Sequence, residues 1–149
     1  MVKLIQILAV SVVLVCASSA ARADDYEDGA AAARHGDYAT ALKLLSPLAQ
    51  NGHATAQYNL GEMYYNGNGV AQDYKEAMKW YRLAADQGLA GAQNILGYMY
   101  FIGRGVTQDY NEAVKWYRLA ADQGLAGAQY FTGLLYYKGR GAHKTIRKQ

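Results

Sequence analysis

A segment of 36 residues that occurs twice in tandem constrains the fold of this chain more than any other sequence feature. Residues 56–91 and residues 92–127 are identical at 27 of 36 positions. A third copy begins at Ala128 and departs from the pattern after Gly141, and a divergent copy precedes the first. A unit of this size cannot bury its apolar face alone, but stacked units share one continuous core. The sequence therefore predicts a repeat array.

The second half of each unit has the pattern of an amphipathic helix. Asp73 is a good N-cap residue and Glu76 stands three positions later, which resembles a capping box with Asp in place of Ser or Thr. Gly88 provides the stop, because glycine readily adopts the left-handed conformation that closes a helix. The next unit repeats these features at Asp109, Glu112 and Gly124. The apolar helix face, at spacings i, i+3, i+4 and i+7, consists of Ala77, Trp80, Tyr81 and Ala84.

The first half of each unit, from Ala56 to about Asn66, also has a helical period and ends at Gly67 and Gly69. A glycine interrupts this helix in each copy and costs about 1 kcal/mol relative to Ala. We therefore expect close helix packing at Gly61, Gly97 and Gly133. No stretch alternates apolar and polar residues over the length of a strand, so the sequence predicts an all-α fold.

The order of residues within the unit resembles the Sel1-like repeat, a relative of the tetratricopeptide repeat. The matching motifs are A-x-A-Q-x-x-L-G-x-M-Y and, after it, G-x-G-V-x-Q-D-Y-x-x-A-x-x-W-Y-x-x-A-A-x-Q-G. The resemblance implies an α-solenoid of stacked antiparallel helix pairs, wound as a right-handed superhelix with a concave binding surface. It also implies a role as an adaptor in signalling or envelope assembly. The chain is similar to the exported bacterial members of this family.

The first 23 residues have the order of a secretory signal peptide. Lys3 provides the positive start, residues 4–15 form an apolar stretch too short to span a bilayer, and an A-x-A site ends at Ala23. We expect cleavage after Ala23 and a periplasmic or secreted protein. A lipid anchor at Cys16 is the less favoured alternative, because the residues before Cys16 do not match a lipobox.

These features divide the chain into three segments. They are a signal peptide (1–23), a Sel1-like solenoid (24–141, with units of about 24–55, 56–91 and 92–127 and a partial unit 128–141) and a basic tail (142–149).

The chain that remains after cleavage has 13 basic and 12 acidic residues, a formal net charge of +1. Such a weak charge argues against nucleic acid as a partner. This part of the chain also has no cysteine and no further apolar run of membrane length. We therefore expect no disulfide, no thiol nucleophile and no membrane insertion.

No residue pattern in this sequence favours catalysis or a cofactor. The glycines of Gly67-Asn68-Gly69 follow a helix rather than a strand, so they are turn glycines and not a phosphate loop. The three histidines, His35, His53 and His143, share no metal-ligand spacing. We expect Trp80 and Trp116 in the core between repeats. The sequence thus predicts a non-enzymatic scaffold without cofactor or metal; the alternatives are an enzyme or inhibitor acting on envelope substrates, or a shortened relative of a longer repeat protein.

The positions at which the two near-identical units differ indicate where a partner binds, because the shared positions maintain the stack. The differing pairs in the first helix are Tyr58/Asn94, Asn59/Ile95, Glu62/Tyr98, Tyr65/Phe101 and Asn66/Ile102. Three pairs lie on one helical stripe, which the third unit continues. We predict a protein or peptide partner on this stripe, which consists of Tyr58, Glu62, Tyr65, Asn94, Tyr98, Phe101, Tyr130, Leu134 and Tyr137.

Overall fold

The computed structural model describes residues 24–140, and these residues are helical with turns between the helices. The helices are residues 24–34, α2 (Tyr38–Gln50), α3 (Ala54–Asn66), α4 (Tyr74–Asp86), α5 (Ala90–Ile102), α6 (Tyr110–Asp122) and α7 (Ala126–Tyr137). The described residues contain no strand, as predicted. The expected signal peptide with Cys16 and the basic tail lie outside them.

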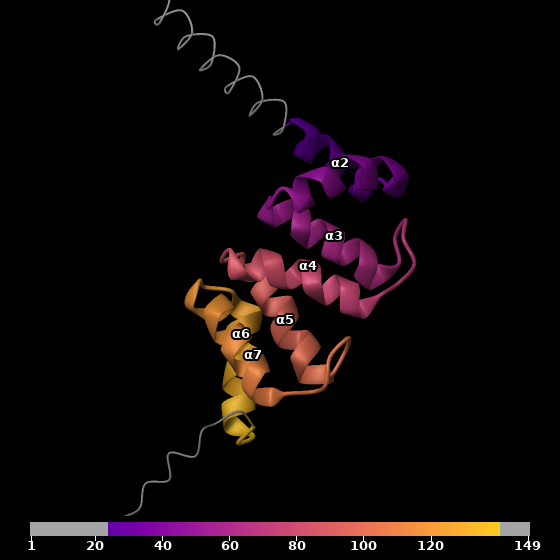
Figure 1. Cartoon of the computed structure of the whole chain (residues 1–149). Helices are drawn as coiled ribbons and strands as arrows, with labels where there is room; N and C mark the ends of the chain where they lie inside the picture. Colours follow the sequence, from indigo (N-terminus) through magenta and orange to yellow (C-terminus); the bar gives the residue numbers. More distant parts are fainter. Residues whose placement is uncertain (1–23, 141–149) are drawn as a thin grey trace, which may run out of the picture.

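The helices stack in the order of the sequence. Each helix from α2 onwards packs mainly on the helix before it and the helix after it (Figure 1). This arrangement of antiparallel helix pairs is the predicted α-solenoid. No helix within residues 24–140 is long and apolar enough to cross a membrane.

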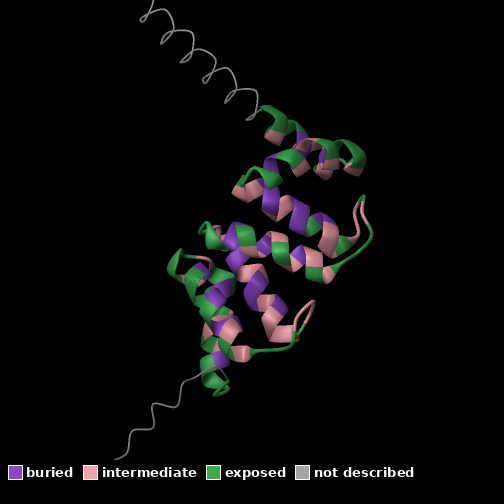
Figure 2. Ribbon diagram, viewed as in Figure 1, coloured by how far each residue is buried: buried purple, intermediate pink, exposed green. Residues whose placement is uncertain are grey.

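The core is a row of apolar clusters, and the tryptophans connect them. Buried positions run through the inside of the stack (Figure 2). Trp116 of α6 belongs to the cluster formed by α4 and α5, and Trp80 of α4 packs against the cluster formed by α2 and α3. Both side chains therefore reach back into the preceding unit, which confirms their predicted place between repeats.

Two of the helix glycines allow the close packing that the sequence predicted. A Cβ atom on Gly61 would lie 2.9 Å from the ring of Tyr81, and one on Gly97 would lie 2.7 Å from the ring of Tyr117. Gly133 on α7 would meet nothing within 4 Å, because no described helix follows α7. The glycine is thus required in the units 56–91 and 92–127 and has no such role among the described residues of the partial unit that begins at Ala128.

The helix caps agree with the sequence in part. The Asp73 carboxylate accepts hydrogen bonds from the backbone N–H groups of Lys75 and Glu76, at 2.9 and 3.0 Å. The reciprocal half of the predicted capping box is wrong, because the Asp73 N–H donates to the carbonyl of Tyr64 and Glu76 pairs with Lys79. The loop before α4 folds back onto α3, so the Asp73 N–H donates to a carbonyl of α3 and not to the Glu76 side chain.

Buried glutamines join successive units. Gln93 is only 4% exposed and donates from Nε2 to the carbonyl of Ala85, 3.1 Å away, while its Oε1 accepts from Gln123 Nε2 at 2.8 Å. Gln57 makes the matching contacts with Ala49 and Gln87. Each buried amide is thereby satisfied on both sides, and the polar joint fixes the register between one helix pair and the next.

Candidate functional site

The predicted stripe begins on α3, where its rings pack against α4 of the same unit. The Tyr58 hydroxyl donates to the Glu62 carboxylate at 3.3 Å, and the Tyr58 ring lies 5.5 Å from the ring of Tyr81. The Tyr65 ring lies 5.1 Å from the ring of Tyr74 and 6.5 Å from that of Tyr81. Tyr58 and Tyr65 are half-buried and Glu62 is exposed, so it is the packing of the two rings that holds them in fixed orientations.

A pocket of about 180 Å³ opens between α3, α4 and α5, and we call it the tyrosine pocket. Tyr81 of α4 is buried in the core and also lines the pocket. Three of the lining residues, Glu62, Tyr65 and Tyr98, belong to the predicted stripe. The complete lining consists of Glu62, Tyr65, Asn66, Tyr81, Ile95 and Tyr98.

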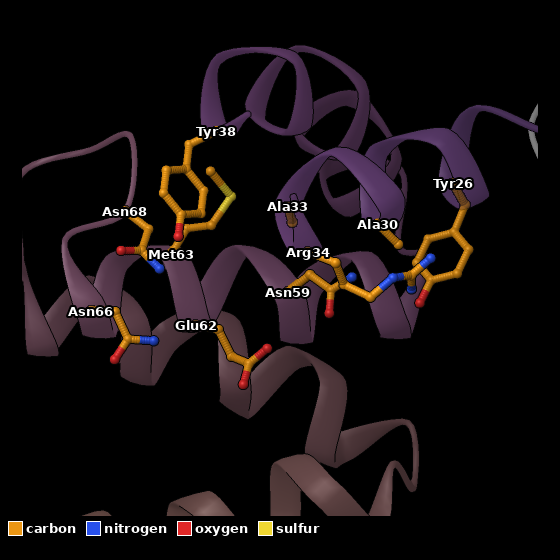
Figure 3. A pocket seen from close by; sticks show the side chains of 10 residues that line it. All are labelled: Tyr26, Ala30, Ala33, Arg34, Tyr38, Asn59, Glu62, Met63, Asn66 and Asn68. Carbon is orange, nitrogen blue, oxygen red and sulfur yellow. The ribbon is translucent and has the colours of Figure 1, made fainter. Parts of the chain in front are cut away.

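A second pocket of about 320 Å³ adjoins it and is lined by residues 24–34, α2, α3 and the loop after α3. We call it the amino-terminal pocket. Asn59, Glu62 and Asn66 project from α3, and Figure 3 shows Asn59 beside Arg34, with Glu62 and Asn66 farther along the helix. The lining consists of Tyr26, Ala30, Ala33, Arg34, Tyr38, Asn59, Glu62, Met63, Asn66 and Asn68.

Small residues open the amino-terminal pocket. An added Cβ on Gly29 would meet Leu45 at 2.9 Å, as one on Gly61 would meet Tyr81, so the two glycines occupy equivalent places. Ala30 and Ala33 then stand where the next unit has Glu62 and Tyr65. Arg104 covers the rings of Tyr65 and Tyr74 at 5.6 and 5.1 Å, whereas the residue 36 positions earlier, which lines the amino-terminal pocket, is the shorter Asn68.

The two pockets form one groove, because both are lined by Glu62 and Asn66. This inner groove crosses the first helices of three successive units. The groove does not contain the whole stripe: Phe101 packs between Tyr110 and Phe131, with ring centroids 5.8 and 6.0 Å apart. The members of the stripe outside it are Tyr58, Asn94, Phe101, Tyr130, Leu134 and Tyr137.

Sequence reasoning missed some residues of the groove although their signal was present. The pairs Asn59/Ile95 and Asn66/Ile102 differ between the two units but lie off the chosen stripe. In the structure Asn59, Asn66 and Ile95 all line the groove. Tyr26, Arg34 and Tyr38 come from the divergent first unit, where the comparison between near-identical copies gives no signal.

The electrostatics of the groove centre on Glu62. Partial burial of its carboxylate raises the pKa of Glu62, and the hydrogen bond from Tyr58 opposes this shift. Burial, with a smaller contribution from the Glu62 charge, raises the pKa of Tyr58 to about 12. Within residues 24–140 the ion pairs are Lys79–Glu76 and Lys115–Glu112, so Glu62 has no basic partner there. The groove therefore contains an unpaired carboxylate beside aromatic rings.

The chemistry of the groove is that of binding. Its polar groups are amides, phenols, one guanidinium and one carboxylate, set among apolar side chains. No cluster of three or more potential metal ligands occurs within the described residues. His53 is exposed and caps α3, where its Nδ1 accepts from the N–H of Ala56. Amides and phenols among apolar side chains suit recognition of a ligand.

Comparison with known proteins gives matches to one repeat family along most of the chain. The Sel1 repeat family model matches residues 18–53, 54–89, 90–125 and 126–144. An uncharacterized protein of Neisseria meningitidis is 56% identical over 34 residues, which are 23% of this chain and 7% of that protein.

Solved structures show the same architecture. A protective antigen of uropathogenic Escherichia coli with an SLR fold aligns with a TM-score of 0.68 and 46% identity, over 69% of this chain and 22% of the antigen. A Sel1 repeat protein from Oxalobacter formigenes gives a TM-score of 0.74 and 37% identity, over 78% of this chain and 48% of that protein. Cysteine rich protein B of Helicobacter pylori gives a TM-score of 0.58 and 28% identity, over 60% of this chain and 68% of that protein. Thus the chain spans half or less of the first two structures.

Proposed function

Because this chain belongs to the Sel1 repeat family, whose members generally mediate protein–protein interactions, we propose that it is a non-enzymatic scaffold of the bacterial cell envelope that binds a polypeptide in its inner groove. The observation that carries the proposal is the groove itself. It lies on the first helices and is lined at positions where the two near-identical units differ. Shared positions build the stack and differing positions are free to select a partner.

The residue types in the groove suit a polypeptide partner. Tyr65 and Tyr98 offer a large contact area at a low cost in side-chain entropy, and Tyr is enriched among interface hot spots. The amides of Asn59 and Asn66 carry both donors and acceptors, as a peptide backbone requires. Packing of Tyr65 against Tyr74 and Tyr81 holds its ring in place before any partner arrives, which lowers the cost of binding.

The envelope location is a proposal that rests on the sequence of residues 1–23. The intact mass of protein recovered from the envelope fraction tests it. A chain that begins at Asp24 without a lipid supports the proposal, whereas a lipid-modified chain that begins at Cys16 makes the protein a membrane-anchored scaffold.

Binding is tested with variants of the groove and of the outer surface. A partner captured from the envelope fraction is titrated against the wild type, Tyr98→Ala and Lys75→Ala. We expect Tyr98→Ala to weaken binding about thirtyfold, the effect of losing about 2 kcal/mol at a hot spot. Lys75 is exposed on α4, outside the groove, so Lys75→Ala should bind like the wild type.

Two results would contradict the scaffold proposal. The first is wild-type affinity in a folded Tyr98→Ala variant whose binding is lost on changing the basic residues between Lys144 and Lys148, which would make the tail the binding site. The second is turnover of a cell-wall substrate by a protein that captures no specific partner, which would favour the enzyme alternative.

A further inference from the structure

We propose that the tyrosine pocket is a receptor for one basic side chain, a lysine or an arginine, of the partner polypeptide. The inference rests on the proposed function and goes further, because it assigns the chemistry of the residue that the partner inserts.

The pocket combines the two features that attract a cation. Tyr65, Tyr81 and Tyr98 place aromatic rings around it from three different helices. An aromatic face attracts an ammonium or guanidinium group within about 6 Å of the ring centroid, and the attraction grows when water is excluded. Glu62 adds a full negative charge at the same place.

The carboxylate of Glu62 lacks a cation of its own. The ion pairs of residues 24–140 do not include it, and its hydrogen bond comes from the neutral phenol of Tyr58. Two arginines lie nearby. Arg34 lines the amino-terminal pocket together with Glu62 but forms no ion pair with it, and Arg104 lies over the Tyr65 ring and donates to the Tyr65 hydroxyl at 2.6 Å. The Glu62 carboxylate is exposed at the mouth of the pocket and is therefore accessible to a ligand that supplies a positive charge.

The next unit provides an internal comparison, because the equivalent place there is built differently. Tyr98 stands where the pocket has Glu62, and Leu134 stands where it has Tyr98. Phe131 replaces Ile95 and stacks on Tyr117, with 5.2 Å between ring centroids and an interplanar angle of 11°. An aromatic stack in the unit 92–127 thus stands where the unit 56–91 has an opening with a carboxylate.

The size of the pocket favours one side chain of a larger partner. Its volume is about 180 Å³, below the roughly 300–1,000 Å³ of pockets for drug-sized ligands. The amino-terminal pocket continues the surface for the residues that flank the inserted side chain. A free quaternary ammonium ion has the same charge and would contact the same rings. The experiment therefore compares such an ion with a basic side chain of a polypeptide.

The test is a titration of the purified protein followed by nuclear magnetic resonance. The probes are the blocked tripeptide Ala-Lys-Ala, the same tripeptide with the neutral isostere norleucine, and tetramethylammonium. We expect the lysine peptide to shift signals of α3 and α5 and to bind at least tenfold more tightly than the norleucine peptide. Glu62→Gln should remove this preference.

Matched variants distinguish the pocket from general electrostatics. Glu76→Gln removes the same charge from α4, where the carboxylate pairs with Lys79, and should leave the preference for lysine intact. Tyr98→Leu introduces the residue of the next unit and should weaken binding, whereas Tyr98→Phe keeps the ring and should retain it.

Equal binding of the lysine and norleucine peptides, or equal effects of Glu62→Gln and Glu76→Gln, would overturn the assignment. Binding of tetramethylammonium without binding of the lysine peptide would overturn it as well, in favour of a small cation. The proposed function is judged separately with the captured partner. If Tyr98→Ala abolishes partner binding and Glu62→Gln does not, the scaffold stands and the basic-residue receptor fails.

Discussion

Replacing the glycine inside each first helix by alanine should change stability in opposite directions in equivalent units. A Cβ on Gly97 would lie 2.7 Å from the ring of Tyr117, which is fully buried. Overpacking of this kind costs about 3 kcal/mol at the upper end of its usual range. Removing a helix-interior glycine returns about 1 kcal/mol. Gly97→Ala should therefore lower the free energy of unfolding by about 2 kcal/mol.

Gly133 is the matched control, since it occupies the same place in α7. An added Cβ there meets nothing within 4 Å, so only the gain in helix propensity remains. Gly133→Ala should raise the free energy of unfolding by about 1 kcal/mol. The two variants should thus differ by about 3 kcal/mol although the substitution is identical.

Urea unfolding followed by circular dichroism measures both values. Gly61→Ala should behave like Gly97→Ala, because its Cβ would lie 2.9 Å from the Tyr81 ring. Equal midpoints for Gly97→Ala and Gly133→Ala would refute the reasoning. A destabilised Gly133→Ala would show that another part of the chain or a second molecule packs on α7 in solution.

Three further predictions concern the core joints and the groove. Gln93→Ala should cost about 1–3 kcal/mol of unfolding free energy, because it removes a buried side chain and its hydrogen bonds with the Ala85 carbonyl and the Gln123 amide. Gln129→Ala is its control in the same denaturation assay and should cost under about 1 kcal/mol, since Gln129 is exposed. Trp116→Ala should cost about 3–5 kcal/mol, and an unchanged melting midpoint in circular dichroism would place the ring outside the core. Partial burial raises the pKa of Glu62 above its ordinary value of 4.5, so ionised Glu62 opposes folding at neutral pH and this penalty disappears as the pH falls through the raised pKa towards 4.5. The difference in unfolding free energy between wild type and Glu62→Gln should shrink over that range while binding of the lysine peptide weakens; a constant difference would contradict the shift.

The opposite trends expected for Glu62 have one cause. Protonation removes the charge whose desolvation raises the pKa of Glu62 and which attracts the basic ligand. The pKa values of Tyr58, Tyr81 and Arg104 near Glu62 are all raised, so these three groups keep their protonation states over this range. A pH profile of binding that is unchanged by Glu62→Gln would therefore exclude this carboxylate as the ligand for the cation.

The sequence could predict the repeat, the helix pairs and the place of the tryptophans, because each follows from local periodicity. Helix spacing and glycine punctuation are properties of neighbouring residues, and a copy displaced by 36 residues must pack in the same way. The capping box was the local exception. A long-range hydrogen bond to the Tyr64 carbonyl satisfies the Asp73 N–H, and no local pattern reveals it.

The binding site was predictable only in part. The differing positions identified the first helices, and Glu62, Tyr65 and Tyr98 do line the tyrosine pocket. The sequence did not reveal that Phe101 is packed between Tyr110 and Phe131, since that contact joins three helices.

The sequence by itself determined that this chain is a Sel1-like array of helix pairs, because periodicity fixes which face of each helix must be buried. The tertiary structure alone decided where the array is open. Whether a given position faces a pocket depends on the size of its neighbour in the next unit. Ile95 lines the tyrosine pocket, whereas Phe131, the residue at the equivalent position 36 residues later, stacks on Tyr117. Cavities are differences between large packed volumes, so a change of one ring opens or fills them while the helical pattern stays the same.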